Sequence, residues 1–288
     1  LEAHPEKYAV LLVPAPAPLW KPARWQTIRN WIHRGGHAIV EGGPLLGTEA
    51  ACLAPALGIR PGELSPYSAF YVQLDGDVTL TSAPETPLLV HERPVRFDLA
   101  QARPLCSLLE PLDEWDLARG VTHRTSVLPP RTRGRGPAMT IHRFGRGTAV
   151  FVAGSLTRAY WAHSHPWLRD LLVAALRLLP AGPLELDAPP WVDVSLMQVG
   201  KAWVLHLVQF CLSHGAGAEP GFWHGDHYHL IEQTRPLFDL PFRLRVPAPP
   251  QRVVLLPGGD PLPFRYQDGL LTGVVPRLDL HAALSVEF

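Results

Sequence analysis

The densest group of acidic side chains surrounds Trp115 and comprises Glu110, Asp113, Glu114 and Asp116. Two carboxylates that flank a sugar about 5–10 Å apart are the catalytic groups of glycoside hydrolysis. Closeness in sequence does not create that geometry, and this segment is flanked by prolines and has weak periodicity. We therefore expect a solvated loop. A stand-alone hydrolase that uses the cluster is the enzymatic alternative.

A second group combines histidines and aromatic residues in the glycine-rich stretch 211–229. Imidazoles bind metal ions, but their spacing here matches no strong metal-binding signature, so we expect neither a metal nor another cofactor. The low-ranking metal candidates are His224, His227 and His229. Exposed aromatic side chains commonly mark recognition surfaces, and we favour a subunit contact over a sugar contact. The aromatic candidates are Phe222, Trp223 and Tyr228.

Nucleophilic catalysis is not expected. An amidotransferase-type nucleophile needs a cysteine on a tight strand-to-helix elbow, whereas Cys52 falls within an expected helix. Gly154-Ser155-Leu156 is likewise no Gly-x-Ser-x-Gly elbow. The three cysteines, Cys52, Cys106 and Cys211, are far apart and odd in number, which favours buried or free thiols in a reducing, cytoplasmic compartment.

Charge and hydropathy exclude two classes of partner. The chain carries 26 basic and 26 acidic residues, so no overall field attracts nucleic acid. The one basic run follows no phosphate-loop pattern, and we expect a solvated loop there; it comprises Arg131, Arg133 and Arg135, with His123 and Arg124 nearby. No stretch reaches the roughly 18 consecutive apolar residues of a membrane span, so we expect a soluble protein.

The elements that position these groups begin with a strand–helix–strand unit. The apolar run 8–13 predicts a strand buried on both faces of a parallel sheet. Residues 21–33 predict a helix, and 37–40 the next strand. The segment 41–44 then lies at the carboxyl end of that strand, the edge at which open α/β sheets bind ligands. The apolar residues at helical spacing are Trp25, Ile28 and Ile32.

The middle of the chain is less regular. We expect a short helix over 49–57 and, between residues 58 and 136, only a few short strands such as 70–74. Residues 139–144 and 148–153 predict a hairpin whose second strand is central. Ser164 is expected to cap a helix with Pro166 in its first turn. The apolar stripe of that helix is Leu168, Leu171, Leu172, Ala175 and Leu179.

After residue 184 the hydrophobic period changes from helical to two, which indicates a small antiparallel β-sandwich over 184–288 behind an α/β domain over 1–183. Asp268-Gly269 is a strong signal for a two-residue hairpin turn. The expected strands include 192–196, 202–210, 242–246, 252–256 and 270–275.

Several of these segments resemble the β-galactosidase trimerisation domain. They are Tyr8–Pro14, the helix end Trp31–Gly36, the strand His37–Val40, the hairpin Phe144–Gly154, which is similar to a closing Gly-Lys-Gly strand, and His206–Phe210, which is similar to a strand of the following β-domain. The resemblance implies a flavodoxin-like (class I glutamine-amidotransferase-like) parallel sheet. It also implies that the chain starts after the usual first strand and helix of that sheet.

In that family the catalytic residues belong to an upstream TIM barrel, so the resemblance assigns none to this chain. It implies a non-catalytic accessory and oligomerisation region of a β-galactosidase-like glycoside hydrolase, working as a homo-oligomer, with a trimer expected. A carbohydrate-binding module that holds sugar through Trp223 and Tyr228 is the binding alternative.

Overall fold

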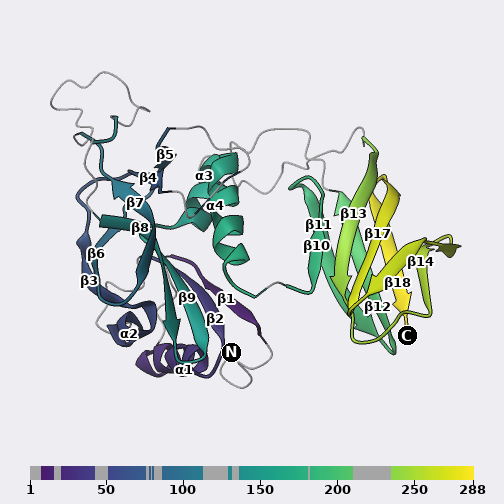
Figure 1. Cartoon of the computed structure of the whole chain (residues 1–288). Coiled ribbons are helices and arrows are strands. Elements are labelled where there is room, and N and C mark those ends of the chain that lie inside the picture. Colours follow the sequence, from purple (N-terminus) through teal and green to yellow (C-terminus); the bar gives the residue numbers. More distant parts are fainter. Residues whose placement is uncertain are drawn as a thin grey trace. The chain divides into compact units, whose positions relative to one another are not determined.

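The computed structural model describes residues 8–15, 21–42, 51–75, 78, 80, 86–112, 129–131, 136–180, 182–209 and 235–288. Contacts divide the chain into two compact units, residues 1–180 and 181–288 (Figure 1). Each unit has its own apolar core. Among the described residues, no helix has the length and hydropathy needed to cross a membrane.

The first unit contains a seven-stranded mixed sheet of order β1-β2-β9-β8-β7-β4-β5. The pairs β1–β2 and β2–β9 are parallel, and every later pair in that order is antiparallel. The prediction of a parallel sheet therefore holds for only one half. The strands are β1 (Val10–Val13), β2 (His37–Glu41), β9 (Gly147–Val152), β8 (Gly136–Phe144), β7 (Arg103–Leu109), β4 (Phe70–Leu74) and β5 (Leu88–Val90).

The strand–helix–strand unit is confirmed. Helix α1 (Pro22–His33) begins with proline in its first turn and buries one apolar face. The prediction that the first strand is buried on both faces is wrong, because β1 is the outermost strand of the described sheet and Leu12 is 42% exposed. The buried residues of α1 are Trp25, Ile28, Trp31 and Ile32.

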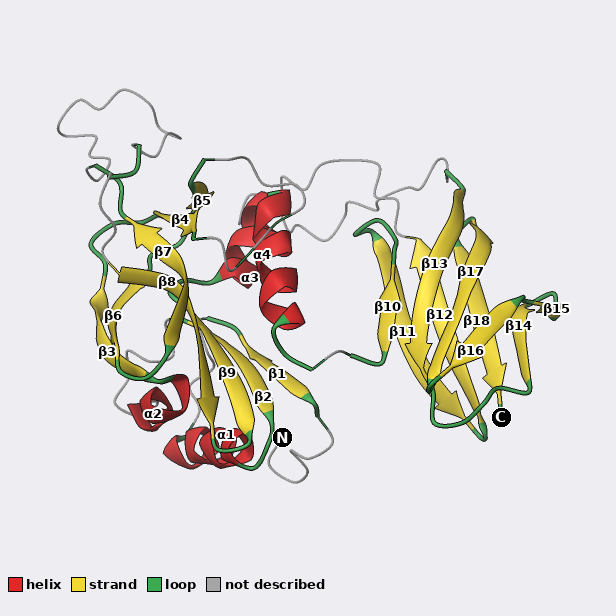
Figure 2. Cartoon of the chain, in the orientation of Figure 1, coloured by secondary structure: helices red, strands yellow, loops and turns green. Residues whose placement is uncertain are grey.

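Helices lie on both faces of this sheet. Figure 2 shows α1 and α2 (Ala54–Leu57) together on one side, and α3 (Leu156–His163) with α4 (Pro166–Arg177) on the other. The helix expected over 49–57 is shorter in the structure: a 3-10 turn, η3 (Ala51–Leu53), leads into the single turn of α2.

Ser164 does not cap α4, contrary to prediction. It adopts a left-handed conformation with φ 52°, and its backbone N–H donates to the Tyr160 carbonyl oxygen at 2.7 Å. It therefore ends α3, a helix that sequence reasoning missed, and His165 is the N-cap of α4. The predicted apolar stripe of α4 is buried at Leu168, Leu171, Ala175 and Leu179, with Leu172 partly buried against the same core.

The poorly periodic middle segment contains more strands than expected. Strand β4 has the predicted bounds 70–74, and the hairpin of β8 and β9 is confirmed with its second strand central. Strands β5 and β7 were not predicted. A separate antiparallel pair, β3 (Ile59–Leu64) with β6 (Val95–Leu99), was also missed, and a shift of register between Pro61 and Leu64 interrupts this pairing.

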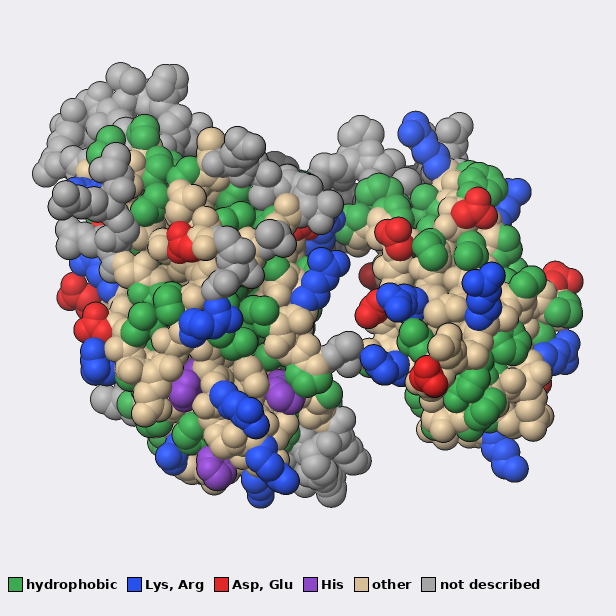
Figure 3. Space-filling view, viewed as in Figure 1, with side chains coloured by type: hydrophobic (Ala, Val, Ile, Leu, Met, Phe, Trp, Pro, Cys, Tyr) green, Lys and Arg blue, Asp and Glu red, His purple; other side chains and the backbone are tan. Residues whose placement is uncertain are grey.

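The second unit consists of two antiparallel sheets whose facing side chains form one core, of orders β10-β13-β17-β16 and β11-β12-β18-β14-β15. The Asp268-Gly269 turn is confirmed: φ is 51° and 78° at these residues, as a type I′ turn requires. On the face in Figure 3, acidic, basic and apolar side chains of this unit are interspersed. The strands are β10 (Leu184–Leu186), β11 (Val192–Val199), β12 (Ala202–Gln209), β13 (Leu237–Arg245), β14 (Arg252–Leu256), β15 (Asp260–Pro261), β16 (Phe264–Gln267), β17 (Leu270–Leu278) and β18 (His281–Glu287).

Candidate functional site

The three parallel strands bring polar groups together at their carboxyl ends. Ala15 follows β1, Glu41 is the last residue of β2, and Ser155 follows β9 at the start of α3. Gly42 allows this closure, because a Cβ atom there would lie 2.1 Å from the carbonyl oxygen of Ala153. The edge at which open α/β sheets bind ligands is thus built from these segments.

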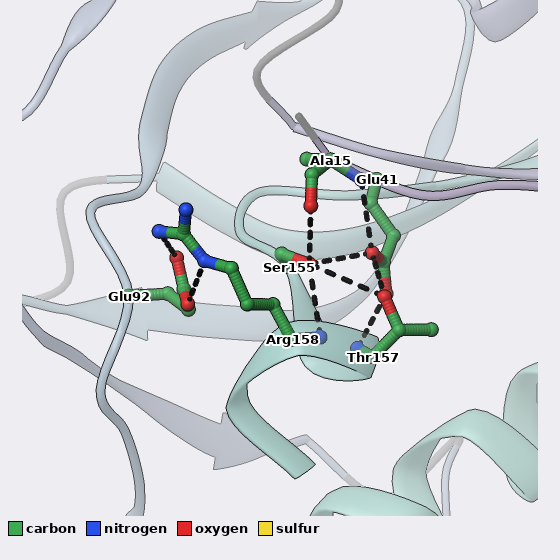
Figure 4. A network of polar contacts seen from close by, with 6 residues as sticks. All are labelled: Ala15, Glu41, Glu92, Ser155, Thr157 and Arg158. Carbon is green, nitrogen blue, oxygen red and sulfur yellow. Dashed lines mark hydrogen bonds and ion pairs between the residues drawn. The ribbon is translucent and has the colours of Figure 1, made fainter. Parts of the chain in front are cut away.

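At this edge the Glu41 carboxylate is fully buried and accepts four hydrogen bonds (Figure 4). Its Oε2 accepts from the hydroxyls of Ser155 at 2.7 Å and Thr157 at 2.6 Å, and from the backbone N–H of Ala15 at 3.2 Å. Its Oε1 accepts from the backbone N–H of Thr157 at 2.8 Å. Every one of these donors is a neutral group, and no cation among the described residues bonds directly to the carboxylate.

The carboxylate also lies at the N-terminus of a helix. Ser155 is the N-cap of α3, and its Oγ accepts from the backbone N–H of Arg158 at 3.2 Å. The first N–H groups of a helix and its dipole form an anion site. In this chain Glu41 occupies that site, so the protein's own side chain fills the position at which related folds hold a ligand.

A partly buried ion pair lies beside this network. The Arg158 guanidinium binds both carboxylate oxygens of Glu92, with Nε donating to Oε1 at 2.5 Å (Figure 4). Glu92 is 7% exposed, whereas the Arg158 side chain is 56% exposed. The hydrogen bonds to Glu92 raise the pKa of Arg158; burial opposes this, and the charges of Glu92 and Glu41 add to it. This pair joins α3 to the segment after β5.

Glu110, the first residue of the acidic cluster, is a structural group in the fold. It is fully buried, accepts from Ser65 Oγ at 3.0 Å, and accepts from Arg96 Nε at 2.7 Å. Burial lowers the pKa of Arg96, but its bonds to Glu110, helped by Glu63, outweigh burial and raise it. A carboxylate held in this way has no access to a substrate. Asp113, Glu114, Trp115 and Asp116 lie outside the described residues.

Arg131 is also engaged internally. Its guanidinium donates to the carbonyl oxygens of Pro111 and Leu112 at 3.0 and 2.8 Å, and to the hydroxyl of Tyr67 at 2.8 Å. It therefore ties the chain segments 110–112 and 129–131 together. Arg133, Arg135, His123 and Arg124 fall outside the part of the chain that the structure describes.

The described cysteines are packed rather than activated. Cys106 is buried in β7 and Cys52 lies partly buried in η3, and neither is in a disulfide. Burial raises the pKa of Cys52, against a smaller lowering by the Arg29 charge. A catalytic thiol needs the opposite shift. Cys211 is outside the described residues.

The remaining candidates are in the segment 210–234, which is not among the described residues. They are His224, His227 and His229 for a metal, and Phe222, Trp223 and Tyr228 for a sugar or subunit contact. Within the described ranges, no group of three His, Cys, Asp or Glu side chains is placed to hold a metal ion.

Sequence reasoning missed the groups that the fold brings together. Glu41 was identified only as part of a loop, although a carboxylate that directly ends an apolar strand, His37–Glu41, was a usable signal. Glu92 and Arg158 are 66 residues apart, and nothing in the sequence indicated that they would pair. The same is true of His91, which packs on His163.

No model of a known protein family matches the sequence, and no curated protein matches it. The fold is similar to that of solved glycosidases. An α-L-fucosidase isoenzyme 2 from Paenibacillus thiaminolyticus has a TM-score of 0.81 at 21% identity, over 98% of this chain and 41% of the fucosidase. Gan42B, a GH42 β-galactosidase from G. stearothermophilus, has a TM-score of 0.57 at 13% identity, over 100% of this chain and 33% of its own.

A β-galactosidase from Bacillus circulans sp. alkalophilus has a TM-score of 0.56 at 15% identity, over 98% of this chain and 33% of its own. The chain thus spans about two fifths of the fucosidase and one third of the β-galactosidases. These identities establish likeness of fold alone. The likeness covers about one third of each β-galactosidase and fits the predicted resemblance to a trimerisation domain with a following β-domain.

Proposed function

We propose that this chain is a non-catalytic accessory and oligomerisation region of a larger glycoside-hydrolase-like protein. The observation that carries the proposal is the extent of the fold likeness: nearly the whole chain matches a fucosidase and two β-galactosidases, yet it accounts for less than half of each. Such a match is expected of a region that accompanies a separate catalytic domain.

The chemistry of the described residues supports the same proposal. Glycoside hydrolysis requires two accessible carboxyl groups that face a sugar. The two fully buried glutamates, Glu41 and Glu110, are both committed to internal hydrogen bonds. At the carboxyl edge of the parallel strands, Glu41 also fills the helix N-terminus that would otherwise accept an anionic ligand.

In this proposal residues 1–183 are a trimerisation-type domain with a flavodoxin-like, class I glutamine-amidotransferase-like ancestry, and residues 184–288 are a β-sandwich. The parallel half of the seven-stranded sheet supports the first assignment, and the single core shared by two antiparallel sheets supports the second. The expected assembly is a homo-oligomer, in particular a trimer, with the catalytic barrel upstream.

Light scattering of the chain, beside the longest protein that contains it, tests the assembly role. We expect a mass of three chains that does not change with dilution, since a cyclic trimer closes all its contacts. If only the longer protein is a trimer, part of the interface lies upstream of this chain, and that result still supports the proposal. Monomers in both samples would contradict it.

An activity assay tests the non-catalytic part separately. We expect no hydrolysis of nitrophenyl galactosides or fucosides by the chain alone. Turnover that disappears in Glu114→Gln and persists in Glu185→Gln, a change of an exposed carboxylate, would instead establish the stand-alone hydrolase. Titration calorimetry with the same sugars tests the alternative of a carbohydrate-binding module. That alternative predicts a measurable heat of binding.

A further inference from the structure

The turn between α3 and α4 packs on the end of β5 through three imidazoles. His91 directly follows β5, His163 ends α3 and His165 is the N-cap of α4. The ring centroid of His91 lies 4.5 Å from that of His163 and 6.3 Å from that of His165, and the latter two are 5.9 Å apart. His165 in turn stacks on Trp167 at 4.4 Å with an interplanar angle of 13°.

Two further contacts join the same helices to the same sheet edge. Trp167 Nε1 donates to the carbonyl oxygen of Leu89 in β5 at 3.1 Å, and Arg158 binds Glu92. Strand β5 is the last strand of the described sheet, so it is held on one side by β4 and is otherwise covered through these contacts. The apolar stripe of the α3–α4 hairpin packs in the core of the first unit, and at this edge a small number of further side chains hold the hairpin to β5.

The charged and titratable groups around the imidazoles are few. From the sheet edge come His91 and Glu92, and Glu92 is bound by Arg158 of α3. From α4, Arg169 and Asp170 pair with each other one turn beyond His165. Strand β4 presents no charged side chain over 70–74. Arg93 follows Glu92 in the chain. The charges that act on His91 are those of His163 and His165, and the charge that acts on His165 is that of His163.

We propose that His91, His163 and His165 form a proton-sensitive latch that holds the α3–α4 hairpin against β5 while the imidazoles are neutral and loosens it when they take up protons. Protonation would place like charges about 5 Å apart, and these charges repel. His91 and His165 are partly buried, whereas His163 is exposed. Protonation would also place a cation at the N-terminus of α4, against the helix dipole. Stacking on Trp167 favours a charged His165 alone and so opposes the effect at one ring of three.

The direction of the effect agrees with the surroundings of His91 and His165. Burial lowers the pKa of His91, and the charges of His163 and His165 lower it further. Burial and the His163 charge lower the pKa of His165. A histidine with a lowered pKa binds its proton more weakly in the closed hairpin than in the open one. Acid therefore favours the open state, and the effect begins as pH falls below the ordinary value of 6.5.

Amide hydrogen exchange of the full chain at pH 7.5 and 5.5, corrected for intrinsic exchange rates, tests the latch. Between 6.5 and 5.5, each proton taken up only on opening shifts the equilibrium by up to about tenfold. We expect protection of residues 156–177 to fall by roughly tenfold or more at pH 5.5, while protection of β2 and β9 changes less than twofold.

The double variant His91→Asn with His163→Asn should show a clearly smaller fall in the hairpin's protection between pH 7.5 and 5.5, because only His165 then remains to take up a proton on opening. The matched control is His206→Asn with His281→Asn, which removes a stacked pair of imidazoles in the second unit and should leave the hairpin's response as in the unchanged protein. Equal protection of the unchanged protein at both pH values would overturn the proposal, whatever the variants do. An undiminished fall in the double variant would overturn it too. Neither result depends on the oligomeric state or on the proposed accessory role.

Discussion

The two halves of the seven-stranded sheet each bury one glutamate completely, and they stabilise it by different means. In the parallel half, Glu41 accepts from two hydroxyls and two backbone N–H groups, and no cation of the described segments bonds to it. In the antiparallel half, Glu110 is held by the Arg96 guanidinium together with Ser65. The same side chain, at the same burial, is thus solvated by dipoles in one half and by a charge in the other.

Topology accounts for the difference. Parallel strands end at a common edge, and the helix that follows β9 begins there with the backbone N–H of Thr157 donating to Glu41. Within the described residues, the antiparallel strands place no helix terminus at Glu110. Without such preorganised donors, a buried carboxylate requires a counter-ion, because the desolvation cost of an unpaired charge is several kcal/mol.

The largest effect is expected from Glu41→Ala. The change leaves the donors of Ser155, Thr157 and Ala15 without their acceptor and leaves a cavity, so we expect the first unit to lose about 3–5 kcal/mol in its free energy of unfolding. Urea denaturation measures it. Glu41→Gln should recover only part of the lost free energy of unfolding, because its amide N–H₂ would face a donor. If Glu41→Gln is as stable as the unchanged protein, the carboxylate is not the group that these donors require.

The antiparallel half should behave differently because its partner is a cation. Glu110→Ala leaves Arg96, which is 24% exposed and still contacts Glu63 at 3.2 Å, so we expect a smaller loss of about 2–3 kcal/mol. Adding Arg96→Met to Glu110→Ala should recover part of that loss, since no stranded charge then remains. Additive losses in this double-mutant cycle would show that the two side chains do not stabilise each other.

The sequence predicted the parallel half better than the antiparallel half, and for a related reason. The strand–helix–strand pattern is local, so the periodicity of residues 21–33 and 37–40 was sufficient to assign α1 and β2. Strands β5 and β7 pair across the chain with β4 and β8, and no local pattern specifies such partners. The Glu41 and Glu110 sites depend on contacts between residues as far as 116 apart, which is why neither was predicted.

A serine hydroxyl serves each glutamate, and the two serines sharpen the comparison. Ser155 donates to Glu41 and also caps α3, whereas Ser65 donates to Glu110 and accepts only from the backbone N–H of Tyr67, at 3.3 Å. Removal of an N-cap typically costs about 1 kcal/mol, and this cost adds to the loss of any other hydrogen bond that the side chain makes. We therefore expect Ser155→Ala to cost about 1.5–2 kcal/mol and Ser65→Ala about 0.5–1 kcal/mol in the same denaturation experiment. Equal costs would mean that the cap contributes nothing measurable.

The smallest effects should be the same in both halves. Gln26 donates to Asn30 on the surface of α1, which packs on the parallel half, and Ser107 donates to Asp75 on the antiparallel half; both bonds are exposed. Water replaces the lost partner at either position, so Gln26→Ala and Ser107→Ala should each cost about 0.5 kcal/mol or less. Equality at the surface with inequality at Glu41 and Glu110 would locate the difference between the halves in their buried carboxylates. A surface difference of more than about 1 kcal/mol would instead mean that one half is weaker throughout, independently of how its glutamate is stabilised.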